Sequence, residues 1–83
     1  MKHAGPAALD ALEPLLARVR AIPSLKEKAR GTFYLRSRAC LHFHEDPSGL
    51  YADLRLAGDD FTRLPVSSPT DQDELMRQLK ALA

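Results

Sequence analysis

Several features that would point to a particular class of protein are missing from this chain of 83 residues. Its single cysteine excludes a framework of disulfides within the chain and fits a reducing compartment. No apolar run approaches the roughly 18 residues of a membrane-spanning helix. Residues 1–6 lack the apolar core of a signal peptide. We therefore expect a cytoplasmic protein.

An excess of charge of one sign is also missing, since 12 Lys and Arg face 11 Asp and Glu, for a net charge of +1. This balance gives no electrostatic reason to bind nucleic acid or an anionic membrane, and we expect neither as a partner. The chain has no internal repeat, no glycine-rich phosphate loop and no nucleophile elbow. Its length predicts one domain, residues 1–83, with 1–6 as a flexible tail.

Two segments have the apolar periodicity of helices. The first has helical spacing but is interrupted by Pro14. Either Asp10 is the N-cap of a helix with Pro14 in its first turn, or a kinked helix begins near Pro6. The second helix begins with Ser68 as N-cap and Pro69 in the first position. The apolar residues of the two helices are Leu9, Leu12, Leu16 and Val19, then Leu75, Met76, Leu79 and Leu82.

The segment 40–56 predicts an antiparallel hairpin whose register is set by alternation. Apolar residues occupy odd positions before the turn at 46–49 and even positions after it, so the two apolar sets share a face only if paired positions sum to an odd number. A connection of four residues with proline, serine and glycine meets this condition. It pairs His44 with Tyr51, His42 with Asp53, and Cys40 with Arg55.

The remaining strands are weaker predictions. Residues 24–31 are polar and are expected to form a loop. The stretch 33–43 predicts a hairpin that turns at 37–39, because a single strand of this length would be unusually long. Residues 61–66 predict an edge strand, because Pro65 cannot donate a hydrogen bond to a neighbour.

These elements predict an α+β fold, a two-layer sandwich in which a three- to four-stranded antiparallel sheet carries an N-terminal and a C-terminal helix on one face. We expect a core formed by Leu16, Val19, Leu41, Phe43, Leu54, Leu75 and Leu79.

Four short runs carry a resemblance to known proteins: Ile22-Pro23, Phe33-Tyr34-Leu35, Leu41-His42-Phe43-His44 and Tyr51-Ala52-Asp53-Leu54-Arg55. With the first helix they resemble small bacterial "luciferase family" domains and domains of unknown function. More distantly they are similar to the compact proteins of the MmcQ/YjbR type. The resemblance covers the chain from about Leu12 onward. It implies a helix, a small antiparallel sheet and a closing helix, but no role for a particular residue. A flavin-type luciferase needs a far larger barrel, so light production is not expected.

The alternation also predicts a polar sheet face as the candidate site: Tyr34, Arg36, Cys40, His42, His44, Tyr51, Asp53 and Arg55. The cross-strand pair of His42 and Asp53 should raise the pKa of His42. His42 and His44 could chelate a metal with help from Cys40, Asp53 or Glu45, but the same residues also fit a solvated sheet face. Arg55 opposite Cys40 could lower the pKa of the thiol.

The chain has no recognisable catalytic constellation, and we expect no metal and no cofactor. It is best interpreted as an uncharacterised non-catalytic module that binds a protein or small molecule, or self-associates, through the polar face. Open sheet edges favour a homodimer. The alternative is a small His- or metal-dependent enzyme that uses His42, His44 and Asp53.

Overall fold

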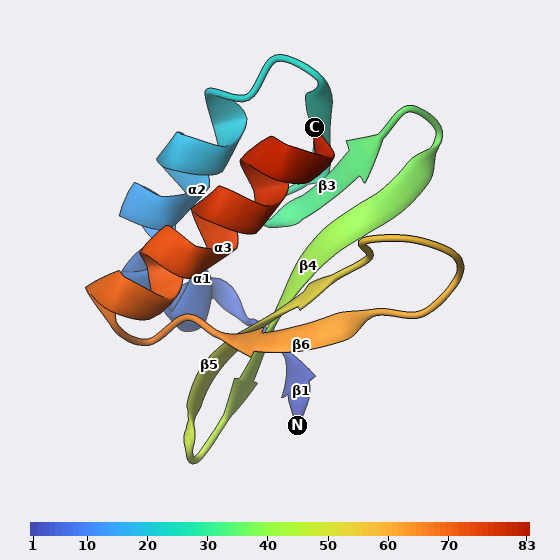
Figure 1. Ribbon diagram of the computed structural model, residues 1–83. Coiled ribbons are helices and arrows are strands. Elements are labelled where there is room, and N and C mark those ends of the chain that lie inside the picture. Colours follow the sequence, from blue (N-terminus) through green and yellow to red (C-terminus); the bar gives the residue numbers. More distant parts are fainter.

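An antiparallel sheet of six strands and three helices make up this protein, and the computed structural model describes all 83 residues (Figure 1). In the sheet the strand order is β2-β3-β4-β5-β6, with β1 beside β4. The α+β class and the antiparallel sheet are confirmed, but the sheet has more strands than the three or four predicted. In chain order the elements are β1 (Lys2–His3), α1 (Pro6–Ala11), α2 (Glu13–Arg20), β2 (Leu25–Ala29), β3 (Thr32–Leu35), β4 (Arg38–Asp46), β5 (Gly49–Leu54), β6 (Thr62–Pro65) and α3 (Pro69–Leu82).

Strand β2 occupies the segment 24–31, where a loop was expected. It pairs with β3, so that Leu25 faces Leu35 and Lys26 faces Tyr34. Leu25 is buried, whereas most of the other residues of β2 are exposed. Charged side chains are typical of an edge strand, where they discourage pairing with other chains. Such a strand shows no alternation of apolar and polar residues, and this lack of alternation is why a loop was predicted.

Strand β1 lies within residues 1–6, where a flexible tail was expected. The pairing of β3 with β4 extends only as far as Leu41, which leaves the edge of the second half of β4 available. There Lys2 faces Glu45 and His3 faces His44, and the N–H of Ala4 donates to the carbonyl of Phe43 at 3.0 Å. Pairing these backbone groups is favourable because unpaired buried N–H and C=O groups are costly.

The register of β4 and β5 is as predicted. His42 faces Asp53 and His44 faces Tyr51. The pattern continues beyond the strand, where the N–H of Arg55 donates to the carbonyl of Cys40 at 2.8 Å. Strand β6 is the edge strand that was predicted, and it ends at Pro65. The alternation of apolar and polar residues therefore determines which side chains share each face of this part of the sheet.

The turn between β3 and β4 lies earlier than predicted. It consists of Arg36 and Ser37 rather than residues 37–39, and Arg36 has a left-handed backbone with φ of 59°. The pairing shifts by one residue between Phe33 and Tyr34, which leaves Cys40 without a partner on β3. The shift offsets the change in register that the shorter turn would cause. As a result, Phe33 and Leu41 face one another and are both fully buried.

The first helix is kinked, as one of the two alternatives predicted. Helix α1 begins at Pro6, and Leu12 joins its end to α2, which contains Pro14 in its first turn. The capping-box alternative is wrong, because neither α1 nor α2 has a side-chain cap and Asp10 bonds to Arg30 instead. Helix α3 begins as predicted, since the Ser68 hydroxyl accepts the N–H of Asp71 at 3.1 Å.

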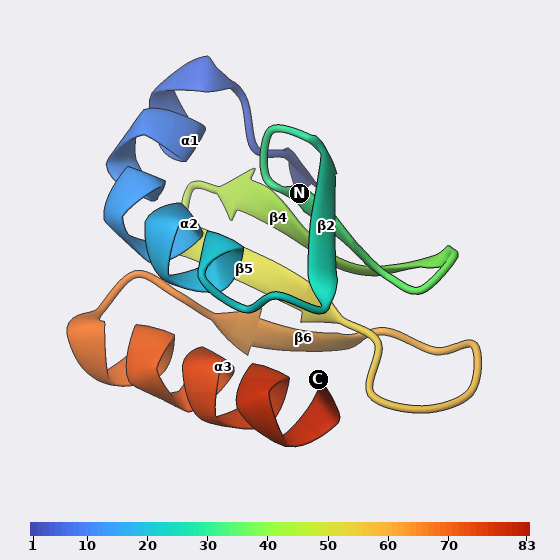
Figure 2. The ribbon, with the colours of Figure 1, turned by 90° about the horizontal axis from the view of Figure 1, so that it is seen from above.

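One hydrophobic core joins α2, α3 and the apolar side of the sheet, and the helices lie along this side in Figures 1 and 2. Every residue predicted for the core is buried there. The buried core residues include Leu15, Leu16, Val19, Phe33, Leu41, Phe43, Leu54, Leu75 and Leu79.

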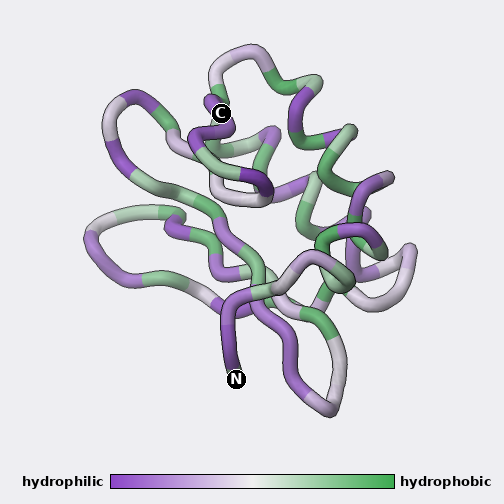
Figure 3. Tube along the Cα trace, turned by 180° about the vertical axis from the view of Figure 1, so that it is seen from behind, coloured by the Kyte–Doolittle hydropathy of each residue, from purple (hydrophilic) through white to green (hydrophobic).

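The amino-terminal end of the chain, in contrast to the core, is hydrophilic (Figure 3). No helix is both long enough and apolar enough to cross a membrane.

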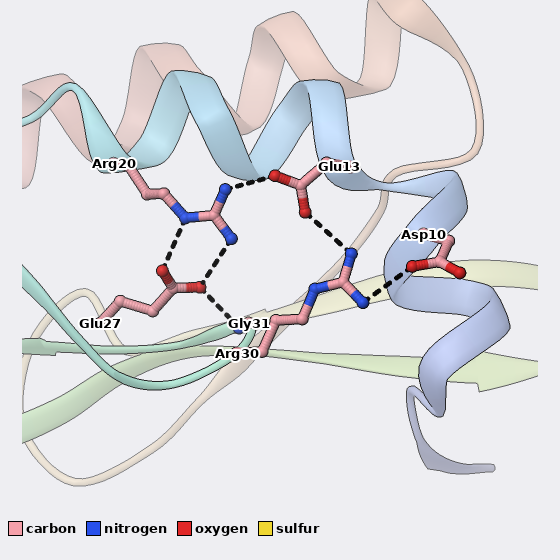
Figure 4. Close-up of polar contacts among 6 residues, drawn as sticks. All are labelled: Asp10, Glu13, Arg20, Glu27, Arg30 and Gly31. Atoms are coloured by element: carbon pink, nitrogen blue, oxygen red, sulfur yellow. Dashed lines mark hydrogen bonds and ion pairs between the residues drawn. The ribbon is translucent and has the colours of Figure 1, made fainter.

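A network of ion pairs connects α1 and α2 to β2 and to the turn that follows β2 (Figure 4). We call it the arginine–carboxylate network: Asp10, Glu13, Arg20, Glu27 and Arg30. Arg20 bonds to Glu13 and Glu27, and Arg30 bonds to Asp10 and Glu13. Glu27 also accepts the N–H of Gly31 at 2.9 Å. The network therefore explains how a polar strand is held against the helices.

Candidate functional site

All three histidines of the chain meet at one place on the polar face of the sheet. His42 and His44 are two residues apart on β4 and so point to the same face, and the pairing of β1 with β4 brings His3 beside His44. With Asp53 of β5 and Arg63 of β6 they form what we call the histidine cluster. Strands β1, β4, β5 and β6, which pair side by side, therefore each contribute to one group of titratable side chains.

The three imidazole rings are in direct contact. Nε2 of His44 lies 2.9 Å from Nδ1 of His42, at hydrogen-bond distance. The ring of His3 stacks on that of His44, with 4.6 Å between centroids, and Phe61 packs against His42 at 4.9 Å. Nδ1 of His44 is buried and has no hydrogen-bond partner. The cluster therefore contains a polar atom that the protein itself does not satisfy.

Asp53 is the anion of the cluster and is bound mainly by arginine. Both carboxylate oxygens accept hydrogen bonds of 2.7 Å from Arg63, in a fork geometry that favours strong charge-assisted bonds. The same carboxylate lies 3.1 Å from Nε2 of His44. These hydrogen bonds from Arg63 lower the pKa of Asp53, although its burial opposes the shift. Asp53 is therefore a fixed negative charge beside the imidazoles.

The predicted rise in the pKa of His42 is wrong. Burial lowers the pKa of His42, the neighbouring His44 lowers it further, and the attraction of Asp53 is too weak to reverse the shift. Burial likewise lowers the pKa of His44. The physical reason is that Asp53 faces His42 in the sheet but directs its oxygens to Arg63 and His44. Both rings are therefore neutral at neutral pH.

The remaining residues of the predicted polar face lie outside the cluster. Cys40 belongs to the hydrophobic core, and burial raises the pKa of its thiol in spite of the charge of Arg55. Arg55 donates to the carbonyl of Ala39 and stacks on Phe61, 4.5 Å from the ring centre. Arg36 is exposed in the turn before β4. The idea that Arg55 activates Cys40 is therefore wrong.

The two tyrosines are also occupied elsewhere. Lys28 lies over the ring of Tyr34 at 5.2 Å, and the hydroxyl of Tyr51 bonds to that of Ser48 at 2.8 Å. Glu45 bonds to the N–H of Gly5 at 2.6 Å and does not join the histidines. The predicted face is therefore divided, and only His42, His44 and Asp53 of the predicted residues meet in the cluster.

Three residues outside the predicted candidate site complete it: His3, Phe61 and Arg63. Arg63 could have been found, because matching the apolar Leu64 to Ala52 across β5 and β6 places it opposite Asp53. His3 gave no comparable signal, because a strand of two polar residues has no pattern to detect.

Comparison of the chain with protein-family models, with curated proteins and with solved structures finds no match. What the site does must therefore be argued from its own chemistry. It offers neutral imidazole nitrogens, a fixed carboxylate and a guanidinium within one patch. Such groups can bind a metal ion, or a small ligand with complementary donors and acceptors.

Proposed function

We propose that this protein is a small non-catalytic binding module, a two-layer domain of the cytoplasm, whose ligand site is the histidine cluster. The observation that carries the proposal is that the three histidines of the chain gather from two strands around one anchored carboxylate. A solvated sheet face with no ligand gives no reason for all three histidines to lie together. The resemblance to the small bacterial "luciferase family" domains is part of this proposal.

The position of the cavities supports binding rather than catalysis. A cavity of about 250 Å³ lies between the β3–β4 turn, the loop after β5 and the end of α3, and none of its lining residues is a histidine. The histidine cluster lies instead on the sheet surface, with His3 exposed and His42 half-buried. Catalysis usually requires a site that excludes water from the reacting atoms. A surface patch in which His44 and Asp53 are buried but His3 is exposed is better suited to holding a ligand or a partner surface.

The alternative, an enzyme that uses His42, His44 and Asp53, is favoured by one observation. Three histidine ligands with one position left open are typical of catalytic zinc sites. Against it, Asp53 is already bound by both donors of Arg63, so it is poorly placed to act as a free base. We therefore keep the binding module as the proposed function.

The proposal is tested by NMR titration of the isotope-labelled protein with three separate probes: zinc chloride, sodium phosphate, and the unlabelled protein itself as a second copy. At least one probe should give saturable shifts centred on the amides of β1, β4, β5 and β6 near the cluster. Replacement of His42 by alanine should remove them, whereas Arg36→Ala, a change in an exposed turn, should not. Shifts with none of the probes, or only at a distance from the cluster, would contradict the proposal.

A further inference from the structure

The three histidines have the arrangement of a metal-binding site. One ring nitrogen from each of His3, His42 and His44 lies within 4.8 Å of the other two. Two of the ligands come from one face of β4, and the third comes from the neighbouring strand β1. Ligands that are held on paired strands are fixed relative to one another by the backbone hydrogen bonds of the sheet, which lowers the cost of assembling the site.

The contact between His42 and His44 is one that a metal ion could replace. Their nitrogens lie 2.9 Å apart and must share one proton when no ion is present. Two imidazoles bound to tetrahedral zinc, at about 2.0–2.1 Å each, have their nitrogens about 3.4 Å apart. The rings therefore need to separate by only a few tenths of an ångström, a change that small side-chain rotations supply.

The position of His3 allows the third bond to form. Its ring is exposed and contacts only the rings of His42 and His44, so a rotation of the side chain can bring a nitrogen inward without disturbing the core. Zinc prefers imidazole and thiolate ligands, and Cys40, the one thiol of the chain, belongs to the core. Three imidazoles leave the fourth tetrahedral position for water or for an atom of an external ligand.

Asp53 places a negative charge beside the imidazole nitrogens. Its carboxylate lies 3.1 Å from Nε2 of His44 and is kept ionised by Arg63. Because Asp53 contacts the same nitrogen of His44 that would bind the ion, its charge would lie beside the ion and compensate part of the ion's charge. The single arginine of the cluster balances Asp53 in the absence of metal, so the patch carries no net charge that would repel a divalent ion.

We propose that His3, His42 and His44 together bind one divalent transition-metal ion, with Zn²⁺ as the ion that their geometry suits best. This inference rests on the proposed function, because it names the ligand of the same site. The sequence led us to expect no metal, and the proposed site also differs in two respects from the metal site considered there. The third ligand is His3 rather than Cys40, Asp53 or Glu45, and the site is built across β1 and β4.

The test is a calorimetric titration of tag-free protein with zinc chloride, repeated with cobalt chloride, whose visible absorption reports tetrahedral coordination. We expect one ion per chain, with no saturable binding of Mg²⁺, an ion that prefers oxygen ligands. His3→Ala is the decisive variant, because His3 is exposed and its loss leaves the core intact. It should weaken Zn²⁺ binding more than tenfold, whereas Lys2→Ala, on the same strand, should leave the affinity unchanged.

His42→Ala and His44→Gln should also weaken binding more than tenfold, and circular dichroism of each variant checks that it is folded. No saturable binding of Zn²⁺ to the wild type, or equal affinity in His3→Ala, would overturn the inference. Binding that survives His42→Ala but not His3→Ala would place the ion at the chain terminus and would also overturn it. If Zn²⁺ fails while phosphate or a second copy perturbs the cluster, the binding module stands without its metal. If all three probes fail, the proposed function fails as well.

Discussion

The arginine–carboxylate network and the histidine cluster are both polar regions held between neighbouring elements, but they differ in how completely their groups are paired. In the network, Arg20 and Arg30 bond to three carboxylates, and every contact joins opposite charges (Figure 4). In the cluster, two imidazoles that cannot both be protonated without repulsion lie in contact, and Nδ1 of His44 has no partner. The charged groups of the network are therefore all paired, whereas the cluster contains a polar atom without a partner.

This difference separates a region that supports the fold from one that is suited to a ligand. The network connects β2, a strand with little apolar content, to α2 through Glu27, and the turn after β2 to α1 through Arg30. The hydrogen bonds from Arg20 and Arg30 lower the pKa of Glu13 to about 2, so its charge persists at any physiological pH. The histidines change their charge much nearer to neutrality and hold their contacts less firmly.

The largest effect is expected from the opposite face of β5, where Leu54 is the neighbour of Asp53 and is fully buried. Leu54→Ala should lower the free energy of unfolding by about 2–4 kcal/mol, because it removes packed side-chain atoms and leaves a cavity. Urea unfolding followed by circular dichroism measures this and gives the scale for both polar regions. A loss below about 1 kcal/mol would mean that the core relaxes to fill the space.

Asp53→Asn should have the next largest effect. The variant removes the acceptor of Arg63 and the charge beside His44, and the site is buried, so we expect a loss of about 1–3 kcal/mol in the free energy of unfolding. Asp10→Asn is the matched control in the network, where the carboxylate is exposed and bonds only to Arg30. If the control costs as much as Asp53→Asn, the two regions do not differ as described.

The two regions should respond to different ranges of pH in metal-free buffer. His42 and His44 have pKa values below their ordinary value of 6.5, so the unfolded chain binds protons more readily than the folded one. The free energy of unfolding should therefore fall by about 1 kcal/mol or less as the pH drops from 6.5 through the lower folded values. Urea unfolding at about pH 7.5 and about pH 5.5 measures this loss.

The carboxylates respond only in stronger acid. The stabilising contribution of Glu13 is complete above its ordinary pKa of 4.5 and is lost as the pH falls through about 2. Glu13→Gln should therefore flatten the pH dependence of stability only below about pH 4.5, whereas the double variant His42→Gln, His44→Gln should flatten it already as the pH falls below 6.5. Equal profiles for the two variants would show that some other group titrates.

The smallest effect is expected from Arg30→Met, and it should depend on salt. Arg30 bonds to Asp10 at 2.8 Å and to Glu13 at 2.9 Å on the surface, where salt screens such pairs. A slight loss of stability at about 0.05 M NaCl should disappear at about 1 M. Arg63→Met, which leaves the buried Asp53 without its arginine and with only the contact to His44, should remain destabilising at both salt concentrations.

The part of the fold that could be predicted from the sequence is the part with an apolar face. The register of β4 and β5 follows from the alternation of Leu41 and Phe43 with the histidines, since a slip of one residue would bury His42. Strand β2 escaped prediction because only Leu25 in it is buried, so that backbone pairing with β3 and the ion pair of Glu27 with Arg20 leave no apolar pattern in the sequence. Hydrophobic periodicity detects buried residues, and β2 has only one of them, Leu25.

For the candidate site, the sequence predicted which residues share a face but not how their side chains are paired. The facing of His42 and Asp53 was correct, yet the carboxylate bonds to Arg63, and so the expected pKa shift had the wrong sign. A charged side chain can bond to any of several neighbours, and which neighbours are within reach of Asp53 depends on the position of β6, which the sequence did not give. Cys40 became a core residue through a local shift of register that alternation cannot reveal.

The pairing of β1 with β4 has a consequence for the order of folding. Gly5 and Glu45, which are bonded at this junction, are 40 residues apart, whereas the β4–β5 hairpin closes across Pro47 and Ser48. Closing the longer loop costs about 2 kcal/mol more in chain entropy, so β1 should dock last and separate first. Amide hydrogens of Ala4 and Gly5 should then exchange faster than those in the centre of β4. The third histidine can leave its two neighbours while the rest of the sheet stays folded.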